Sequence, residues 1–224
     1  VDGSVAMYAN YVYFGDQTGI VQCVDVNTLS PVWAVDTGDN VDATVALDME
    51  DENTLSLYTA NTLMNQGRSG VCTVRKLDAL TGKQLWAYQV PDLVYTTEFE
   101  IGCYASPVVG QNAVKDLVFF TATNGSKGST LFALDKATGS LKWSFPMTSE
   151  SISSPVAVYN AAGNAWIVQA ESAGKLHLLE AKTGAERTSL QLEGNVEGSP
   201  AVYRDVLVIG TTGANSNIYG IKLE

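Results

Sequence analysis

The chain has 224 residues, and 24 acidic against 13 basic residues give it a formal net charge of −11 at pH 7. Such an acidic chain lacks the basic surface that binds nucleic acids and anionic membranes, so we expect neither as a partner. Hydrophobic residues make up 46% of the chain and charged residues 17%, which predicts a folded core. No apolar run reaches the roughly 18 residues of a membrane span, so we expect no direct membrane insertion. The first residue is Val1 rather than Met, which indicates that any signal peptide is absent or has been removed.

Short runs rich in β-branched and aromatic residues recur along the chain, and each is stopped by glycine or by a cluster of polar residues. Such runs are typical of β-strands, and no segment shows a helical stripe over about 11 residues. We therefore predict very little helix. The predicted strands, in chain order, include residues 12–14, 20–25, 71–78, 117–120, 130–135, 166–168, 175–180 and 207–209.

One sequence pattern recurs and divides the chain into units. An aspartate is followed eight positions later by tryptophan in three copies, which are Asp25 to Trp33, Asp78 to Trp86 and Asp135 to Trp143. A fourth copy, from Glu180 to Thr188, has threonine in place of the tryptophan. Tandem units of roughly 45 to 55 residues with four short strands each are typical of the blades of a β-propeller, and the fifth unit has room for only three strands. The predicted units are residues 4–41, 42–104, 105–152, 153–197 and 198–224.

The stretch from Leu131 to Trp143 resembles the docking motif of the pyrroloquinoline quinone (PQQ)-like propeller repeat, Ala-x-Asp-x-x-Thr-Gly-x-x-x-Trp. Two departures are Leu29 in place of the glycine in the first copy and Thr188 in place of the tryptophan in the fourth. The resemblance implies an all-β propeller of four-stranded antiparallel blades with about five repeats, as an incomplete or open ring within a longer protein. The residues expected to dock one blade on the next are Asp25, Trp33, Asp78, Gly82, Trp86, Asp135, Gly139 and Trp143.

The resemblance also bears on function. Quinoprotein dehydrogenases of this family bind PQQ with a vicinal cysteine pair, a stacked tryptophan and calcium, and none of these motifs can be placed on this sequence. Other members resemble scaffold or sensor modules. The resemblance thus favours a non-catalytic, extracytoplasmic binding or scaffold module for a protein partner or small ligand, without a cofactor. The alternatives are a fragment of a PQQ-dependent dehydrogenase, with PQQ and calcium, and the sensor domain of a membrane kinase; open propeller edges would also allow self-association.

Three cysteines and one histidine restrict the metal and redox chemistry. Cys23, Cys72 and Cys103 are odd in number and widely spaced, which excludes a CxxC motif and a zinc site of four thiolates. They are either buried free thiols or include one disulfide, for which Cys72 and Cys103 are the preferred pair. His177 lies in an alternating strand and is predicted to face solvent. We predict no catalytic residue and no metal ligand.

Carboxylates gather in the segments that join the last strand of one unit to the first strand of the next. In a propeller these segments share one face around the channel mouth, where carboxylates can bind a cation or a basic segment of a partner. The simpler interpretation is that the loops of an acidic chain are polar. Two longer loops, residues 61–70 and 91–104, add side chains that either contact a ligand or pack over a blade edge. The residues of this predicted binding face are Asp39, Asp42, Glu98, Glu100, Glu150, Glu197, Tyr95, Phe99 and Tyr104.

Overall fold

The computed structural model describes residues 3–223; Val1 and Glu224, the last residue of the fifth predicted unit, lie outside them. Twenty strands form five antiparallel sheets, and the only helical segments of the described residues are three short 3-10 turns. The prediction of an all-β fold with very little helix is therefore confirmed. The first four sheets have four strands each in sequence order, with β9 attached to the third, and the fifth sheet has three.

Each sheet is one propeller blade. The first blade consists of β1 (Ala6–Tyr8), β2 (Tyr11–Gly15), β3 (Ile20–Asp25) and β4 (Ser30–Asp36), and the second of β5 (Ala46–Asp51), β6 (Thr54–Ala60), β7 (Thr73–Asp78) and β8 (Gln84–Gln89). The third consists of β10 (Val108–Val109), β11 (Leu117–Asn124), β12 (Ser129–Asp135) and β13 (Leu141–Met147), with β9 (Ile101–Gly102) paired to the end of β11. The fourth has β14 (Val156–Tyr159), β15 (Ala165–Ala170), β16 (Lys175–Glu180) and β17 (Glu186–Gln191); the fifth has β18 (Ala201–Tyr203), β19 (Val206–Gly210) and β20 (Ile218–Lys222). The 3-10 turns are η1 (Gly67–Ser69), η2 (Asn112–Val114) and η3 (Gly125–Lys127).

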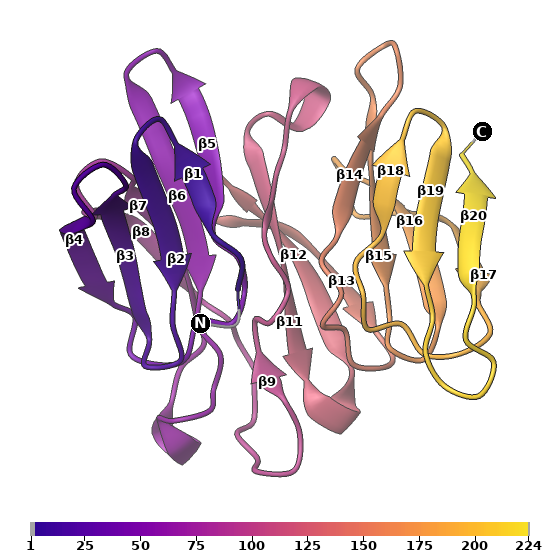
Figure 1. Ribbon diagram of the computed structural model, residues 1–224. Coiled ribbons are helices and arrows are strands. Elements are labelled where there is room, and N and C mark those ends of the chain that lie inside the picture. Colours follow the sequence, from indigo (N-terminus) through magenta and orange to yellow (C-terminus); the bar gives the residue numbers. More distant parts are fainter. Residues whose placement is uncertain (1–2, 224) are drawn as a thin grey trace.

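The blades follow one another around an arc. In Figure 1 the first blade and the fifth blade lie at opposite ends, and the third lies between them. The sheets of residues 3–223 do not close into a ring, so the prediction of an open propeller is confirmed. No helix in this part of the chain is long and apolar enough to cross a membrane.

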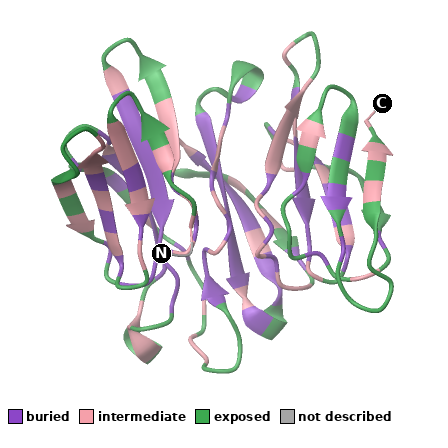
Figure 2. Ribbon diagram, in the orientation of Figure 1, coloured by how far each residue is buried: buried purple, intermediate pink, exposed green. Residues whose placement is uncertain are grey.

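The burial of each strand follows from its place in the arc. All but the last residue of β11 are buried, because blades cover both faces of the third sheet. By contrast, β19 alternates between exposed and buried residues, since only one face of the fifth blade is covered. Figure 2 shows this change from the buried centre of the arc to its exposed C-terminal end. Buried and exposed positions therefore alternate along β19, whereas β11 is buried on both of its faces.

Each pair of successive blades encloses its own apolar core. Because side chains alternate across a strand, β11 supplies Val118 and Phe120 to the core shared with the second blade, and Phe119 to the core shared with the fourth. The four cores are represented by Tyr13 with Leu57, Tyr58 with Phe120, Phe119 with Ile167, and Val168 with Leu207. The fold is thus held by four interfaces in series rather than by one central core.

A tryptophan on the last strand of each of the first three blades docks on the following blade. The indole nitrogens donate hydrogen bonds to backbone oxygens of the next blade, with distances of 2.9 Å from Trp33 to Ala79, 2.8 Å from Trp86 to Lys136 and 3.0 Å from Trp143 to Ala181. Each tryptophan ring covers a glycine in a turn of the next blade. The rings of Trp33, Trp86 and Trp143 lie on Gly82, Gly139 and Gly184, respectively.

Aspartates of the repeated motif start two of the turns that receive these rings, those with Gly82 and Gly139; the turn with Gly184 starts at Glu180. Asp78 accepts hydrogen bonds from the backbone of Leu80 and Thr81, and Asp135 does the same for Ala137 and Thr138. Asp25 makes the equivalent turn in the first blade, with Asn27 and Thr28. In these three turns the aspartate carboxylate accepts hydrogen bonds from the backbone N–H groups two and three positions later. This explains why the turns start with aspartate.

The two departures from the motif lie where this docking does not occur. Leu29 replaces the glycine in the first blade, where it has a φ of 53° and a side chain that is 79% exposed. Thr188, in β17, replaces the tryptophan that would face the fifth blade. The three tryptophans of the motif therefore serve the three junctions from the first blade to the fourth.

Candidate functional site

The connections between blades gather on one face of the arc, at the lower edge in Figure 1, together with the turn between β11 and β12. A cavity of about 640 Å³ opens among them. Three glutamates of the predicted binding face line this cavity, and they come from the three successive connections between the second and the fifth blade. The lining residues are Glu100, Glu150, Glu197, Gly125, Ser126, Thr148, Ser149, Ile152, Ser172, Ala173 and Asn195.

The carboxylates at this cavity are close enough to affect one another. Partial burial raises the pKa of Glu100, and the negative charges of Glu150 and Asp42 raise it further. Burial likewise raises the pKa of the Tyr104 hydroxyl, with a contribution from Glu100 and Asp42. Like charges held together in this way favour the binding of a cation, which would offset their repulsion. We call the lining residues Glu100, Glu150 and Glu197, together with Asp42, which acts on Glu100 without lining the cavity, the acidic cavity cluster.

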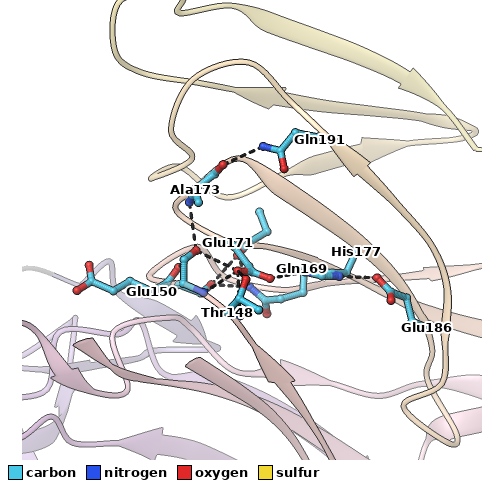
Figure 3. Close-up of polar contacts among 11 residues, drawn as sticks. Thr148, Glu150, Gln169, Glu171, Ala173, His177, Glu186 and Gln191 are labelled. Atoms are coloured by element: carbon cyan, nitrogen blue, oxygen red, sulfur yellow. Dashed lines mark hydrogen bonds and ion pairs between the residues drawn. The ribbon is translucent and has the colours of Figure 1, made fainter. Parts of the chain in front are cut away.

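A buried carboxylate holds one wall of the cavity in place. Glu171 Oε2 accepts hydrogen bonds from the backbone nitrogens of Thr148 and Ser149, at 3.1 and 2.7 Å, and from both of their hydroxyls. Ser149 Oγ in turn accepts from the backbone of Ala173 at 3.2 Å. Figure 3 shows how these contacts join the connection after β13 to the turn between β15 and β16. The wall of the cavity is therefore set from within the fourth blade.

His177 is buried, so the prediction that it faces solvent is wrong. Its side chain is 1% exposed, with Nε2 2.7 Å from Glu171 Oε1 and Nδ1 2.7 Å from Glu186 Oε1. Phe145 of β13 packs edge-on against the ring, because this face of β16 is covered by the third blade. Both ring nitrogens therefore lie within hydrogen-bond distance of a carboxylate oxygen. Figure 3 shows this chain of contacts from the cavity wall to Glu186.

The same contacts set the charge state of the two glutamates. Burial acts to raise the pKa of Glu171, but hydrogen bonds from His177, Thr148 and Ser149 outweigh it and lower that pKa. The hydrogen bond and the charge of His177 lower the pKa of Glu186. Both carboxylates are therefore ionised at neutral pH and act as acceptors.

Asp39 belongs to the predicted binding face but is occupied within the fold. It is fully buried, and its carboxylate accepts hydrogen bonds from the backbone nitrogens of Asn40, Met64, Asn65 and Gln66. It anchors the loop of residues 61–70 against the connection between the first two blades. Since its acceptor positions are filled from inside, Asp39 does not contribute to the cavity.

The residues of the second long loop lie in different surroundings. Tyr95 is partly buried against the core between the second and third blades. Phe99 is exposed at one edge and lies against Gly125, while Glu98 is exposed and does not line the cavity. Tyr104 is partly buried near the acidic cavity cluster. Of this loop, Glu100 is the residue that reaches the cavity.

Several lining residues carry no sequence signal of their own. The turn over residues 124–128 reads as an ordinary hairpin, yet its Gly125 and Ser126 line the cavity. Thr148, Ser149, Ser172 and Asn195 are small polar residues of the kind found in any loop. These residues meet only because the blades stack on one another. The recurrence of acidic residues in the connections between blades is therefore the one sequence signal for this cavity.

The lining does not fit PQQ. PQQ carries three carboxylates, whereas the residues around the cavity include three glutamates and no lysine, arginine or aromatic ring. Like charges would oppose its binding, and no ring is present to stack on it. Within residues 3–223 no three His, Cys, Asp or Glu side chains are grouped closely enough to hold a metal ion.

Sequence comparison places the chain in a family. A family model, PQQ_2, described as outer membrane protein assembly factor BamB, matches residues 71–171 and 127–222. The chain belongs to this family. Among curated proteins, the beta-alanine-activating enzyme of Mus musculus is 32% identical over 114 residues, which are 50% of this chain and 10% of that protein. The Homo sapiens enzyme is 34% identical over 74 residues, 32% of this chain and 7% of that protein. The chain thus spans about a tenth or less of the curated relatives it matches.

Solved structures show the same fold. BamB from Moraxella catarrhalis aligns with a TM-score of 0.69 and 16% identity over 99% of this chain and 61% of that chain. Quinohemoprotein alcohol dehydrogenase from Comamonas testosteroni aligns with a TM-score of 0.67 and 14% identity, over 93% of this chain and 39% of that chain. The PQQ-like propeller fold is therefore shared by an assembly factor and by an enzyme, and the site must decide between them.

Proposed function

We propose that this PQQ_2 family chain is a non-catalytic binding module that holds a cationic segment of a protein partner at its acidic cavity. The observation that carries the proposal is the convergence of Glu100, Glu150 and Glu197 from three successive connections on one cavity. Lysine or arginine side chains would lower the repulsion that raises the pKa of Glu100. The hydroxyl groups of Thr148, Ser149 and Ser172 add hydrogen-bond acceptors for their N–H groups.

The relatives support a module that works as part of a larger assembly. The family description names an outer membrane protein assembly factor, which favours an extracytoplasmic location and a protein partner over a small ligand. The chain also resembles a short portion of a much longer enzyme. A propeller region that recurs in both settings is suited to recognition, because loops on rigid blades carry binding residues without reshaping the fold.

The test measures binding of a short lysine-rich peptide by titration calorimetry at low and at moderate salt. We expect binding that weakens as salt rises, because the attraction is between charged groups near the surface. Glu100→Gln with Glu150→Gln removes two charges of the acidic cavity cluster and should weaken binding by roughly tenfold or more. Glu98→Gln is the matched control, since Glu98 belongs to the same loop but does not line the cavity.

Three further arms separate the alternatives. A glutamate-rich peptide of equal length should not bind, and calcium alone should bind weakly compared with the lysine-rich peptide. PQQ added with calcium should give no change in absorbance. Equal loss of peptide binding in Glu98→Gln and in the double variant would contradict the proposed site, and tight PQQ binding would favour the dehydrogenase alternative.

A further inference from the structure

Two of the three cysteines face each other at the junction between the second and third blades. Cys72 lies directly before β7 and Cys103 directly after β9, and their sulfur atoms are 3.7 Å apart. Both are buried, and all three cysteines are free thiols in this structure. Cys23 lies in a different core, between the first and second blades.

The backbone around the two thiols is tied down on both sides. Thr62 and Gly102 form a bridge, Leu63 donates to the carbonyl of Ile101 at 2.8 Å, and Gly102 pairs with Thr123 of β11. The short strand β9 therefore joins the second blade to the third. Next to it, Cys72 Sγ donates to the carbonyl of Asn61 at 2.9 Å. The two sulfurs are thus presented to each other by ordered backbone, and a disulfide requires them to approach to about 2.05 Å.

We propose that Cys72 and Cys103 form a reversible disulfide that staples the connection after the second blade to the body of that blade. The oxidant is a low-molecular-weight disulfide such as oxidised glutathione. One thiolate attacks a sulfur of that disulfide, forms a mixed disulfide and releases one small thiol. The second thiolate attacks the protein sulfur of the mixed disulfide, which forms the Cys72–Cys103 bond and releases the second small thiol. The two protein thiols lose two protons and two electrons, and the oxidant is reduced to two thiols.

Burial governs how fast the bond forms. The hydrogen-bonded contact with Cys72 and burial both raise the pKa of Cys103, so little thiolate is present in the folded protein. Oxidation of the folded, reduced chain should therefore be slow, whereas oxidation during refolding should be fast. The crosslink joins positions 31 residues apart, and the segment that it closes contains β7, β8, β9 and the loop that carries Glu100 to the cavity.

The experiment refolds the reduced protein in glutathione buffers of graded oxidising strength, quenches with acid, and alkylates in denaturant before peptide mass mapping. We expect a single two-electron transition that links the Cys72 peptide to the Cys103 peptide, with Cys23 alkylated in every buffer. Alkylation of both Cys72 and Cys103 in the most oxidising buffer would overturn the proposal, as would linkage of either residue mainly to Cys23.

Thermal unfolding gives a second measure on the same samples. A closed loop of this length should raise the Tm of the oxidised protein by roughly 5 to 10 °C over the reduced protein. Cys23→Ala should keep this difference between oxidised and reduced samples, and Cys72→Ala with Cys103→Ala should abolish it. The comparison of oxidised and reduced wild-type protein does not depend on how well a variant folds. If reductant leaves the Tm of the wild-type protein unchanged, the proposal is contradicted.

Discussion

At the scale of single residues, a glycine sets how closely two blades approach. Gly139 has a φ of 71°, and a Cβ added there would lie 2.7 Å from the ring of Trp86. Gly67 has nearly the same conformation, with a φ of 69°, but a Cβ there would meet nothing within 4 Å. The two positions separate the cost of a left-handed backbone from the cost of displacing the tryptophan.

We expect Gly67→Ala to lower the free energy of unfolding by about 1 kcal/mol, the cost of a left-handed backbone. Gly139→Ala should cost about 1 to 3 kcal/mol more, because the methyl group must displace the docked ring. Urea unfolding followed by tryptophan fluorescence checks both variants. Equal losses in the two would show that the ring moves without cost.

The contrast between Gly139 and His177 shows what could be predicted from the sequence. The turn glycine is part of a spaced motif, and its role depends on backbone conformation and on one neighbour at a fixed offset. His177 alternates with leucines, which predicts an exposed face only if one side of the sheet meets water. A strand between two packed blades has no such side, and this fact depends on contacts far apart in the chain. The same limit applies to Asp39. Its place in a connection between blades predicts a residue of the binding face, but the residues that bury and bind it, 64–66, belong to the second blade and are distant in the sequence.

At the scale of elements, the connection from β13 to β14 depends on a carboxylate that belongs to neither strand. Glu171 follows β15, accepts four hydrogen bonds from Thr148 and Ser149, and is held on its other side by His177. The connection supplies Thr148, Ser149 and Glu150 to the cavity. Protonation of Glu171 at low pH should therefore weaken the hydrogen bonds that hold this wall of the cavity, and with them the stability of the fold.

The lowered pKa values of Glu171 and Glu186 predict the direction of the pH dependence. A group whose pKa is lower in the folded state stabilises the fold above its unfolded pKa of about 4.3, and this stabilisation is lost as pH falls through the folded pKa. We expect Glu171→Gln to lower the free energy of unfolding by about 3 kcal/mol at pH 7 and to flatten its decline in acid. Denaturant unfolding from pH 7 to pH 3 measures both effects.

Glu98→Gln serves as the control for this pH series, because the exposed Glu98 side chain lies outside the group formed by Glu171, His177 and Glu186. Its pH dependence should follow that of the wild-type protein. A Glu171→Gln variant with the wild-type slope would show that Glu171 is not the group whose protonation weakens the fold.

Elements differed in how well the sequence predicted them. The predicted runs at residues 117–120 and 175–180 fall within β11 and β16, since local composition and turn residues define them. The two-residue strand β9 has no such composition, and it forms only because Gly102 meets Thr62 and Thr123. Local signals therefore predicted the blades, whereas the strand that joins two of them depends on tertiary contacts.

At the scale of the whole molecule, each blade contacts only its neighbours, so stability should be a sum of blades and junctions. Trp33 and Trp143 serve junctions that share no residue. We expect Trp33→Phe and Trp143→Phe to cost about 1 to 2 kcal/mol each, through the lost hydrogen bond and the smaller ring. Their effects should add within about 0.5 kcal/mol in the double variant.

A pair within one junction provides the comparison. Trp143→Phe and Gly184→Ala change two groups that are in direct contact, so their effects on the free energy of unfolding should not add. Chemical denaturation of the singles and doubles measures both couplings. Strong coupling between Trp33 and Trp143 would contradict a serial arrangement of blades.

Leu29 has a consequence for how copies of the chain meet. When two copies of a chain meet through different surfaces, each added copy can bind another in the same way. If the rotation between successive copies does not complete a ring, the product is a fibre. The exposed turn of the first blade would offer a docking position for a tryptophan from another copy if it carried glycine. Leu29 projects from that position instead, and the three docking tryptophans are all engaged within their own chain. A tryptophan from a second copy would meet Leu29 there, instead of the glycine on which each tryptophan ring of this chain lies.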